Sequence, residues 1–166
     1  MQRDCLTACQ TLTFKSFLFS IKTIHWQGIF PRFHPSDFRV KSLDGVADDW
    51  PIDYATLEPF YAENDRQTGV SGLSGDPAYP AKQSVLPPLP MGKSGETLAR
   101  GFNEMGWHWW PSDSAIATQP YNGRDKCINL GNCLHGCAQG AKASTDITYW
   151  PEAIRAGVEL RTWCRV

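Results

Sequence analysis

The clearest helical pattern in the first half of the chain follows Asp53. Aromatic and aliphatic residues return there at positions i, i+3 and i+7, which places them on one face of a helix, and Asp53 is a suitable N-cap. We expect Pro59 to break or restart this helix, because proline cannot donate a hydrogen bond to the preceding turn. The apolar face holds Tyr54, Leu57 and Tyr61, and the acids Glu58, Glu63 and Asp65 are expected on the solvated face.

A second helix is predicted to begin at a cap provided by Ser94. Leu98, Phe102 and Met105 form one apolar stripe along it, and Gly106 ends the pattern. A stripe of this kind is typical of a helix that packs on a hydrophobic core, so we expect these three side chains to be buried.

The end of the chain combines a short helix with an alternating segment. Thr148 can cap the helix, Pro151 is tolerated in its first turn, Ile154 is expected to face inward, and Gly157 ends it. Apolar and polar residues then alternate over residues 158–166. Alternation with a period of two predicts a strand there.

Turn-forming residues fill much of the remaining sequence. The 166 residues include 14 glycines and 12 prolines, and residues 69–90 are expected to form a long surface excursion. A chain of this length can bury one ordinary core, so we expect a single loop-rich domain of the α+β class. Residues 1–20 show no regular period and are expected to be a disordered terminus, which leaves residues 21–166 as the folded region.

Charge and targeting signals exclude some classes of partner. Sixteen basic residues balance 17 acidic ones and the two signs are interspersed, which argues against nucleic-acid binding. The apolar run at residues 17–19 is too short to span a membrane, and no cleavage signal of a secretory peptide follows it. The compartment stays undetermined: cytoplasmic is the default expectation, and a periplasmic parent enzyme is the alternative.

Three of the six cysteines, Cys127, Cys133 and Cys137, fall within one loop. Glycines between them give the backbone the freedom to bring the three sulfurs together. Thiolates are soft ligands that select iron–sulfur clusters, zinc or copper(I), and His135 could complete a tetrahedral zinc site. Buried unreactive thiols, or one disulfide with a spare thiol, are the alternative interpretation.

Aromatic residues are concentrated in two loops, which allows a binding function for the chain. Exposed rings can stack on sugars, so one hypothesis is a secreted carbohydrate-binding module stapled by disulfides, and another is a small structural zinc domain. The same rings could also simply pack against one another. The residues concerned are Trp26, Phe30, Phe33, Trp107, Trp109 and Trp110.

The order and spacing of several short motifs resemble the glucose–methanol–choline family of flavin-dependent oxidoreductases. The resemblance extends from Thr23 to Val166, but the family's Gly-rich βαβ nucleotide-binding unit has no counterpart in this sequence. The matching motifs are Thr23-Ile24-His25-Trp26-Gln27-Gly28, Asp49-Trp50-Pro51-Ile52 with Leu57-Glu58-Pro59-Phe60-Tyr61, Gly69-Val70-Ser71-Gly72, Asn122-Gly123-Arg124, and Gly136-Cys137-Ala138-Gln139-Gly140-Ala141-Lys142 with the segment 149–166.

This resemblance implies an incomplete portion of a two-domain flavoprotein, with parts of its FAD-proximal and substrate-binding regions. In the family, the segment that matches Thr23, His25, Trp26 and Gly28 lies along the flavin, and a histidine at the position of His25 can carry the flavin covalently. Val166 matches a valine that contacts the adenine end of FAD. The family's catalytic histidine has no match here, so no catalytic residue is assigned.

The cysteine spacing is similar to that of bacterial sugar dehydrogenases of this family. The resemblance therefore implies a three-iron cluster on Cys127, Cys133 and Cys137 that passes electrons to a haem-containing subunit, although similar relatives lack a cluster. The function implied for the parent enzyme is oxidation of an alcohol or sugar hydroxyl by hydride transfer to FAD. The chain on its own is expected to be inactive.

Overall fold

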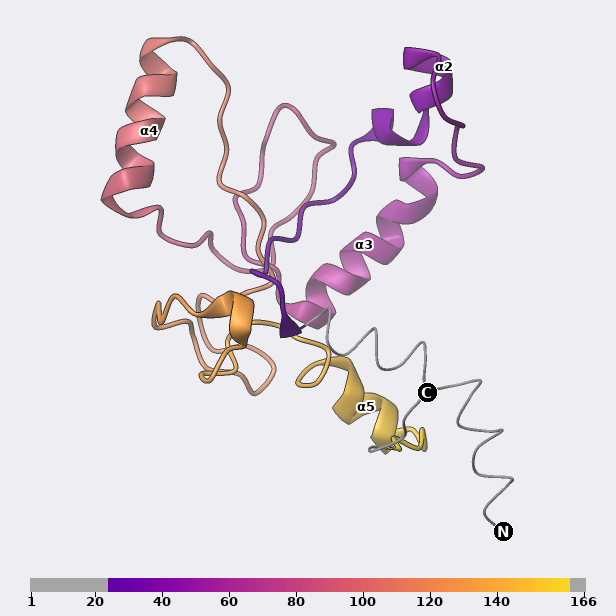
Figure 1. The fold of residues 1–166 in the computed structure, drawn as a ribbon, viewed down its shortest axis with the longest axis vertical. Helices are drawn as coiled ribbons and strands as arrows, with labels where there is room; N and C mark the ends of the chain where they lie inside the picture. The colour runs from indigo at the N-terminus through magenta and orange to yellow at the C-terminus, as the bar shows by residue number, and fades with distance from the viewer. Residues whose placement is uncertain (1–23, 162–166) are drawn as a thin grey trace.

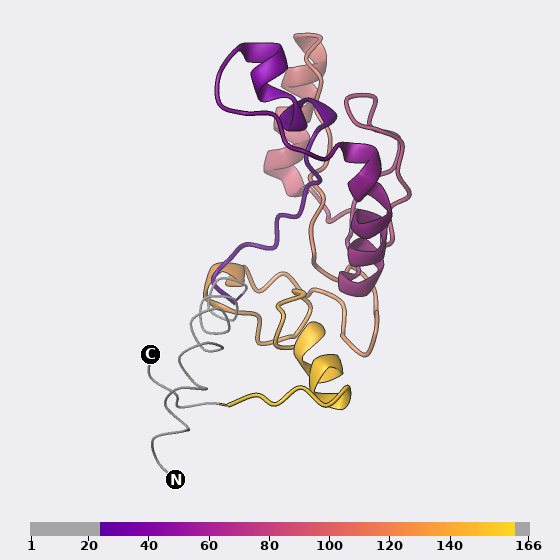
Figure 2. The ribbon, with the colours of Figure 1, turned by 90° about the vertical axis from the view of Figure 1, so that its right-hand side faces the viewer.

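The computed structural model describes residues 24–161, so residues 1–20, expected to be disordered, lie outside the described part of the chain. Helices surround a centre of short extended segments (Figure 1). They are the 3-10 helix η1 (Pro35–Phe38), α2 (Val40–Asp44), α3 (Tyr54–Thr68), α4 (Gly92–Glu104), the 3-10 helix η2 (Cys133–His135) and α5 (Tyr149–Arg155). Helices α2, α3 and α4 lie in the upper part of the molecule, and η2 and α5 lie in the lower part (Figures 1 and 2).

Helix α3 begins as the sequence predicts. Asp53 is its extended N-cap, and one carboxylate oxygen accepts hydrogen bonds from the backbone N–H of Thr56 at 2.8 Å and from its hydroxyl at 2.7 Å. The expectation that Pro59 breaks the helix is wrong, because the helix runs through it to Thr68. Because Pro59 has no N–H, the helix loses one backbone hydrogen bond, the one to the carbonyl of Ala55. Both residues are exposed, so water can bond to that carbonyl instead.

Helix α4 differs from its prediction at its start and in its burial. It begins at Gly92 without a side-chain cap, so Ser94 lies inside the helix. The expected core stripe is wrong, since Leu98 is 61% exposed and Met105 53%, and Ala99 is the buried residue of this helix. Periodicity identifies the residues that share a face but not what covers it. In Figure 1 the helix stands away from the rest of the protein.

The centre of the fold is a set of paired extended segments, which form isolated bridges and no regular strand within residues 24–161. Ser114 exchanges two backbone hydrogen bonds with Ser71, at 2.8 and 2.9 Å. The segment around Ser114 therefore links chain regions that are far apart in the sequence. The bridges join Ile29 to Ser114, Ser71 to Ser114, Ile116 to Lys142 and Tyr121 to Arg124 in antiparallel pairing, and Ser71 to Leu86 in parallel pairing.

Small side chains fill the most buried positions of this centre. Ser71, Ala115, Ala117 and Ala141 have no exposed surface. Side chains of this size let the backbones approach closely, whereas large apolar residues are mostly left near the surface. Lys142 is the exception, because it is a long cationic side chain with 0% exposure in the same centre.

The last described segment only partly follows its prediction. Helix α5 starts after Thr148, whose hydroxyl donates to the carbonyl of Ser144 at 3.0 Å instead of capping the helix. Ile154, expected to face inward, is 49% exposed. Residues 158–161 form no strand, and the remainder of the predicted strand lies outside the described residues.

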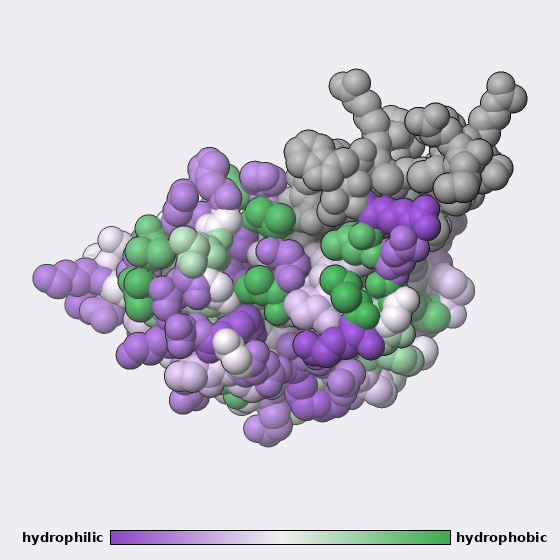
Figure 3. All heavy atoms as spheres, turned by 90° about the horizontal axis from the view of Figure 1, so that it is seen from below, coloured by the Kyte–Doolittle hydropathy of each residue, from purple (hydrophilic) through white to green (hydrophobic). Residues whose placement is uncertain are grey.

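Several apolar side chains reach the surface of the lower part of the molecule. Figure 3, seen from below, shows hydrophobic residues interspersed with hydrophilic ones on this face. The loop that carries the cysteines exposes Ile128, Leu130 and Leu134, each by 46% or more. No helix within residues 24–161 has the length and apolar character needed to cross a membrane.

Candidate functional site

The segment that carries the predicted flavin contacts lies against the cysteine loop, residues 127–137. Lys142 joins the two. Its ammonium donates hydrogen bonds to the carbonyl oxygens of Ile24 at 2.6 Å, Trp26 at 2.8 Å and Cys133 at 2.6 Å. The structure thus brings two sets of predicted site residues, about a hundred positions apart in the sequence, into one junction.

His25 lies at the surface of this junction. Its ring is exposed, and its Nδ1 atom is 3.3 Å from the carbonyl oxygen of Leu134 in the cysteine loop. An exposed imidazole that is held at one nitrogen can present its other nitrogen to a bound group. The position therefore fits the attachment role that the family resemblance implies for this histidine.

Trp26 points the other way, toward the core. Its ring meets Phe30 edge-on with the centroids 5.7 Å apart, and the Lys142 ammonium lies 5.9 Å from its centroid. Its indole N–H is buried and finds no acceptor within the described part of the chain. An unpaired donor in such a place is costly, so it marks a position where an acceptor from elsewhere would be stabilising.

The surroundings of position 28 require a glycine. Its φ of +87° is a backbone conformation that favours glycine, and an added Cβ would lie 2.9 Å from two side-chain carbons of Ile116. The carbonyl of Gly28 accepts a hydrogen bond from the N–H of Ala115 at 2.8 Å, which ties this segment to the centre of the fold. Thr23 and Val166, the other predicted cofactor contacts, lie outside residues 24–161.

The three loop cysteines are free thiols of intermediate burial, so none of Cys127, Cys133 and Cys137 pairs with another. The loop is anchored at its start by a bond from the Cys127 N–H to the carbonyl of Ala117 at 2.8 Å. Within residues 24–161 no three His, Cys, Asp or Glu side chains form a group that could hold a metal ion. The cluster therefore stays a prediction, and it would need the three sulfurs to come closer together.

Two buried cations lie next to these thiols. Burial lowers the pKa of the Lys142 ammonium, and the nearby Cys133 and Cys137 offset only part of this effect. Burial also lowers the pKa of the Arg124 guanidinium, which is likewise near Cys137. Arg124 donates to the backbone carbonyls of Ala141 and Thr68. Both cations thus take backbone carbonyls as acceptors, and one of those bound by Lys142, the Cys133 carbonyl, belongs to the cysteine loop.

A second group of buried charges lies in the upper part of the molecule. Arg32 forms an ion pair with Asp65 and a longer one with Glu58, and it also donates to the hydroxyl of Tyr54 at 3.2 Å. Asp65 is only 5% exposed, so its expected place on the solvated face of α3 is wrong. The sequence pattern missed it because the guanidinium that neutralises it comes from a distant loop.

Both members of this pair have a raised pKa, which favours the charged form of Arg32 and the neutral form of Asp65. Burial lowers the pKa of the Arg32 guanidinium, but hydrogen bonds to Tyr54 and Asp65 outweigh it and leave the pKa above its usual value. Burial raises the pKa of the Asp65 carboxyl, and the bonds from Arg32 offset only part of this. The geometry favours the charged pair, because one Asp65 oxygen accepts two N–H bonds from Arg32.

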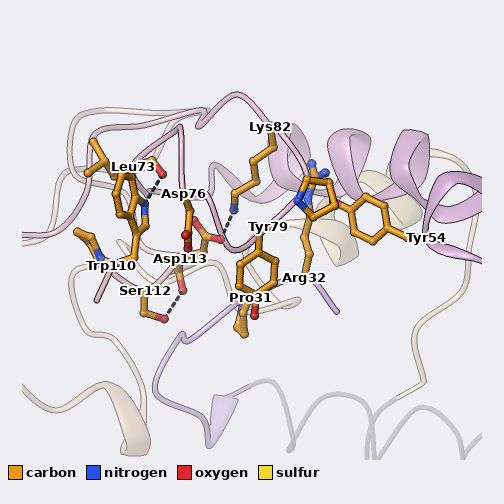
Figure 4. A pocket seen from close by; sticks show the side chains of 12 residues that line it. Pro31, Arg32, Tyr54, Leu73, Asp76, Tyr79, Lys82, Trp110, Ser112 and Asp113 are labelled. Atoms are coloured by element: carbon orange, nitrogen blue, oxygen red, sulfur yellow. Dashed lines mark hydrogen bonds and ion pairs between the residues drawn. The ribbon is translucent and has the colours of Figure 1, made fainter. Parts of the chain in front are cut away.

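A pocket of about 160 Å³ opens beside these charges. Figure 4 shows Lys82 and Asp113 directed toward each other in its wall, and the Trp110 indole donating to the Leu73 carbonyl, at 2.8 Å. Rings and charges together can bind a polar ring-shaped or chain-shaped ligand. The pocket is lined by Pro31, Arg32, Tyr54, Leu73, Asp76, Tyr79, Pro80, Lys82, Trp110, Pro111, Ser112 and Asp113.

The tryptophans that could have stacked on a sugar are divided between different surroundings. Trp107, Trp109 and Trp110 line a second open pocket of about 300 Å³, which adjoins the first at Trp110, whereas Trp26 and Phe30 pack against the core. The histidine between them, His108, bonds the carboxylate of Asp76 at 2.9 Å. These rings therefore do not form one stacking surface, as a carbohydrate-binding module would need.

Comparison with known proteins shows which class of enzyme the chain resembles. No model of a known protein family matches the chain. The chain is 45% identical to 2-methyl-1,2-propanediol dehydrogenase of Mycolicibacterium austroafricanum over 148 residues. The aligned region covers 87% of this chain and 27% of that enzyme. It is 32% identical over 123 residues to the fructose dehydrogenase large subunit of Gluconobacter japonicus, covering 72% of this chain and 23% of the relative. The chain belongs with the alcohol and sugar oxidoreductases.

This oxidoreductase chain is also 28% identical over 148 residues to paromamine 6'-oxidase of Streptomyces fradiae, covering 86% of this chain and 26% of the relative. The recognition of a portion of a glucose–methanol–choline-type oxidoreductase from its motifs is thereby confirmed. The chain spans about a quarter of the length of the curated relatives it matches.

Proposed function

We propose that this chain supplies the flavin-side wall of an oxidoreductase that takes hydride from an alcohol or sugar hydroxyl and passes it to FAD. The observation that carries the proposal is the 45% identity to 2-methyl-1,2-propanediol dehydrogenase over 87% of the chain. The fructose dehydrogenase large subunit and paromamine 6'-oxidase extend the same chemical class of substrate, a hydroxyl compound, to more distant relatives.

The described residues fit a bound flavin at the junction around His25. Bound FAD would accept the hydride. The exposed His25 ring would hold or attach the cofactor, while Lys142 fixes the backbone on either side of that histidine. Gly28 keeps this segment against the centre of the fold, because no side chain fits between its backbone and Ile116. Thr23 and Val166 stay predicted contacts.

The electron acceptor is a second part of the proposal. The name of the fructose dehydrogenase relative, a large subunit, supports an enzyme with further subunits. A haem-containing subunit is the acceptor that the cysteine loop suggests, provided that the loop carries a cluster. The exposed Ile128, Leu130 and Leu134 beside the cysteines are compatible with a covered surface in the complete enzyme.

A chain of this length is expected to show no turnover alone, because no residue in it is assigned as the base that takes the hydroxyl proton. The direct test adds FAD, a panel of alcohols and sugars and an artificial acceptor to the purified chain. The relative 2-methyl-1,2-propanediol dehydrogenase, assayed in parallel with its own diol, is the positive control. Clear turnover by the isolated chain would contradict the expected inactivity.

A chimera tests the proposed contribution of the chain itself. The segment of 2-methyl-1,2-propanediol dehydrogenase that matches this chain is replaced by the present sequence. We expect the chimera to bind flavin and to oxidise the diol, since the replaced segments are 45% identical. A folded chimera that binds no flavin would overturn the proposal.

The same chimera tests His25. In the His25→Ala variant, flavin that is covalently attached becomes extractable by acid, whereas Lys126→Ala, at an exposed position near the cysteine loop, leaves attachment unchanged. If both variants retain the same flavin content and the same attachment, the covalent role of His25 is excluded.

A further inference from the structure

Lys142 is a fully buried cation that makes no ion pair with a carboxylate within residues 24–161, and the charge of Asp146 acts on it only from a longer distance. An ammonium group has three N–H donors, and transferring it from water to the interior is costly unless each finds an acceptor. The structure provides three, the carbonyl oxygens of Ile24, Trp26 and Cys133 at 2.6, 2.8 and 2.6 Å. The hydrogen-bonding capacity of the ammonium is therefore filled entirely by the backbone.

The three acceptors come from two separate segments. Ile24 and Trp26 flank His25, while Cys133 begins the 3-10 helix η2 in the cysteine loop. A further contact between these segments joins His25 to the Leu134 carbonyl at 3.3 Å, at an exposed position. The buried ammonium bonds are charge-assisted and shielded from water, so they are the stronger connection.

We propose that Lys142 is a positioning residue whose ammonium fixes the cysteine loop against the His25 segment. Its ammonium binds several backbone carbonyl oxygens at once, as a bound metal cation can do in other proteins. The relative positions of His25 and Cys133 then depend on one side chain. This inference concerns the chain's own residues and holds whether or not a flavin is bound.

Lys142→Met tests the ammonium separately from the packing of the side chain. Methionine keeps an unbranched stem of similar length but leaves the three carbonyls without a donor. In amide hydrogen exchange followed by NMR, we expect the η2 amides of His135 and Gly136 to exchange at least about tenfold faster than in the wild type, with the helix α3 amides unchanged. Lys126→Met, at an exposed lysine, is the matched control and should leave both groups unchanged.

Unchanged exchange at His135 and Gly136 in a folded Lys142→Met variant would show that the ammonium positions nothing. If that variant does not fold, the wild type gives the answer. In the chain labelled uniformly with ¹³C and ¹⁵N, one lysine ammonium should show slowly exchanging protons and couplings across hydrogen bonds to the three carbonyl carbons. The absence of such a protected ammonium overturns the proposal. Neither measurement uses flavin, so its failure is distinct from failure of the proposed oxidoreductase function.

Discussion

Arg32 donates two N–H bonds to a single carboxylate oxygen of Asp65, at 3.0 and 2.8 Å, with both residues buried. The pair connects the loop that follows the His25 segment to helix α3. Lys82 and Asp113 form a second, largely buried pair close by, and their charges act on the Asp65 carboxyl. Removing one member of a buried pair leaves the other charge without a partner, so the Arg32–Asp65 contact ties α3 to the pocket wall.

Replacing one member of the Arg32–Asp65 pair should be strongly destabilising. In Arg32→Met the Asp65 carboxylate stays buried without its partner, and we expect a loss of about 3–5 kcal/mol in the free energy of unfolding. Urea denaturation followed by circular dichroism measures it.

The matched control is Arg66→Met, which removes an exposed pair with Glu63 on the same helix and should cost less than about 1 kcal/mol. Equal losses in Arg32→Met and Arg66→Met would mean that the buried pair does not hold α3 in place.

The N-cap of α3 predicts a pH dependence. Hydrogen bonds from the side chain and backbone of Thr56 lower the pKa of the Asp53 carboxyl in the folded protein. A carboxyl whose pKa is lowered by folding contributes stability above its ordinary pKa of about 3.9, and this contribution is lost as the pH falls through the folded-state pKa.

Asp53→Asn isolates this effect, because asparagine still caps the helix but does not titrate. We expect the wild type to have a higher urea midpoint than the variant at neutral pH, and the difference to shrink as the pH falls below the ordinary aspartate value. All other acidic residues are the same in the two proteins, so their titration does not contribute to the difference between the two midpoints. A difference that stays constant with pH would contradict the prediction.

Gly28→Ala should combine backbone strain with a clash. The φ of +87° disfavours any side chain, and the new Cβ would lie 2.9 Å from Ile116. We expect a loss of about 1–3 kcal/mol in the free energy of unfolding.

Gly140→Ala is the matched control for Gly28→Ala, since its φ is +72° but no atom lies within 4 Å of the added Cβ. It reports strain alone and should cost less. Combining Gly28→Ala with Ile116→Ala should be less damaging than the sum of the two single changes, because Ile116→Ala removes the clashing carbons. Strictly additive losses would show that Ile116 is not the obstacle.

Local signals in the sequence predicted local structure, and they failed where distant partners decide. The Asp53 cap of α3 depends on neighbouring residues, so the pattern sufficed; the position of Thr148 before α5 is also as predicted, but its hydroxyl does not cap the helix. The burial of Asp65 depends on Arg32, which lies 33 positions away. The exposure of Leu98 on α4 depends on what stands opposite the helix, and no spacing rule contains that information.

The candidate site shows the same division. Motif order over the chain led to the oxidoreductase class, and it singled out His25 and the cysteine loop. Lys142 is only the last residue of a matching motif, and the motif does not predict its burial, because a lysine in a loop is usually solvated. Its three carbonyl acceptors lie up to 118 positions away. The signal that could have suggested its burial is that Lys142 stands between two alanines, Ala141 and Ala143, whose small side chains favour close packing.

The cysteine loop gives the last prediction. We expect the chain purified under anaerobic conditions to contain about three irons and to show a broad visible absorption band. Cys133→Ser should remove both, because each thiolate is needed to hold the cluster. Cys9→Ser, at a cysteine in no proposed site, should remove neither.

The three thiols are free and do not form a metal-holding group in the structure, so binding requires η2 and the neighbouring turns to move. Iron binding should therefore alter the amide resonances of residues 127–137 and leave those of α3 in place. A colourless protein with stoichiometric zinc would show that the loop is a structural zinc site and not an iron–sulfur site, with His135 as the candidate fourth ligand. A metal-free protein with all three thiols titratable would instead assign Cys127, Cys133 and Cys137 to packing.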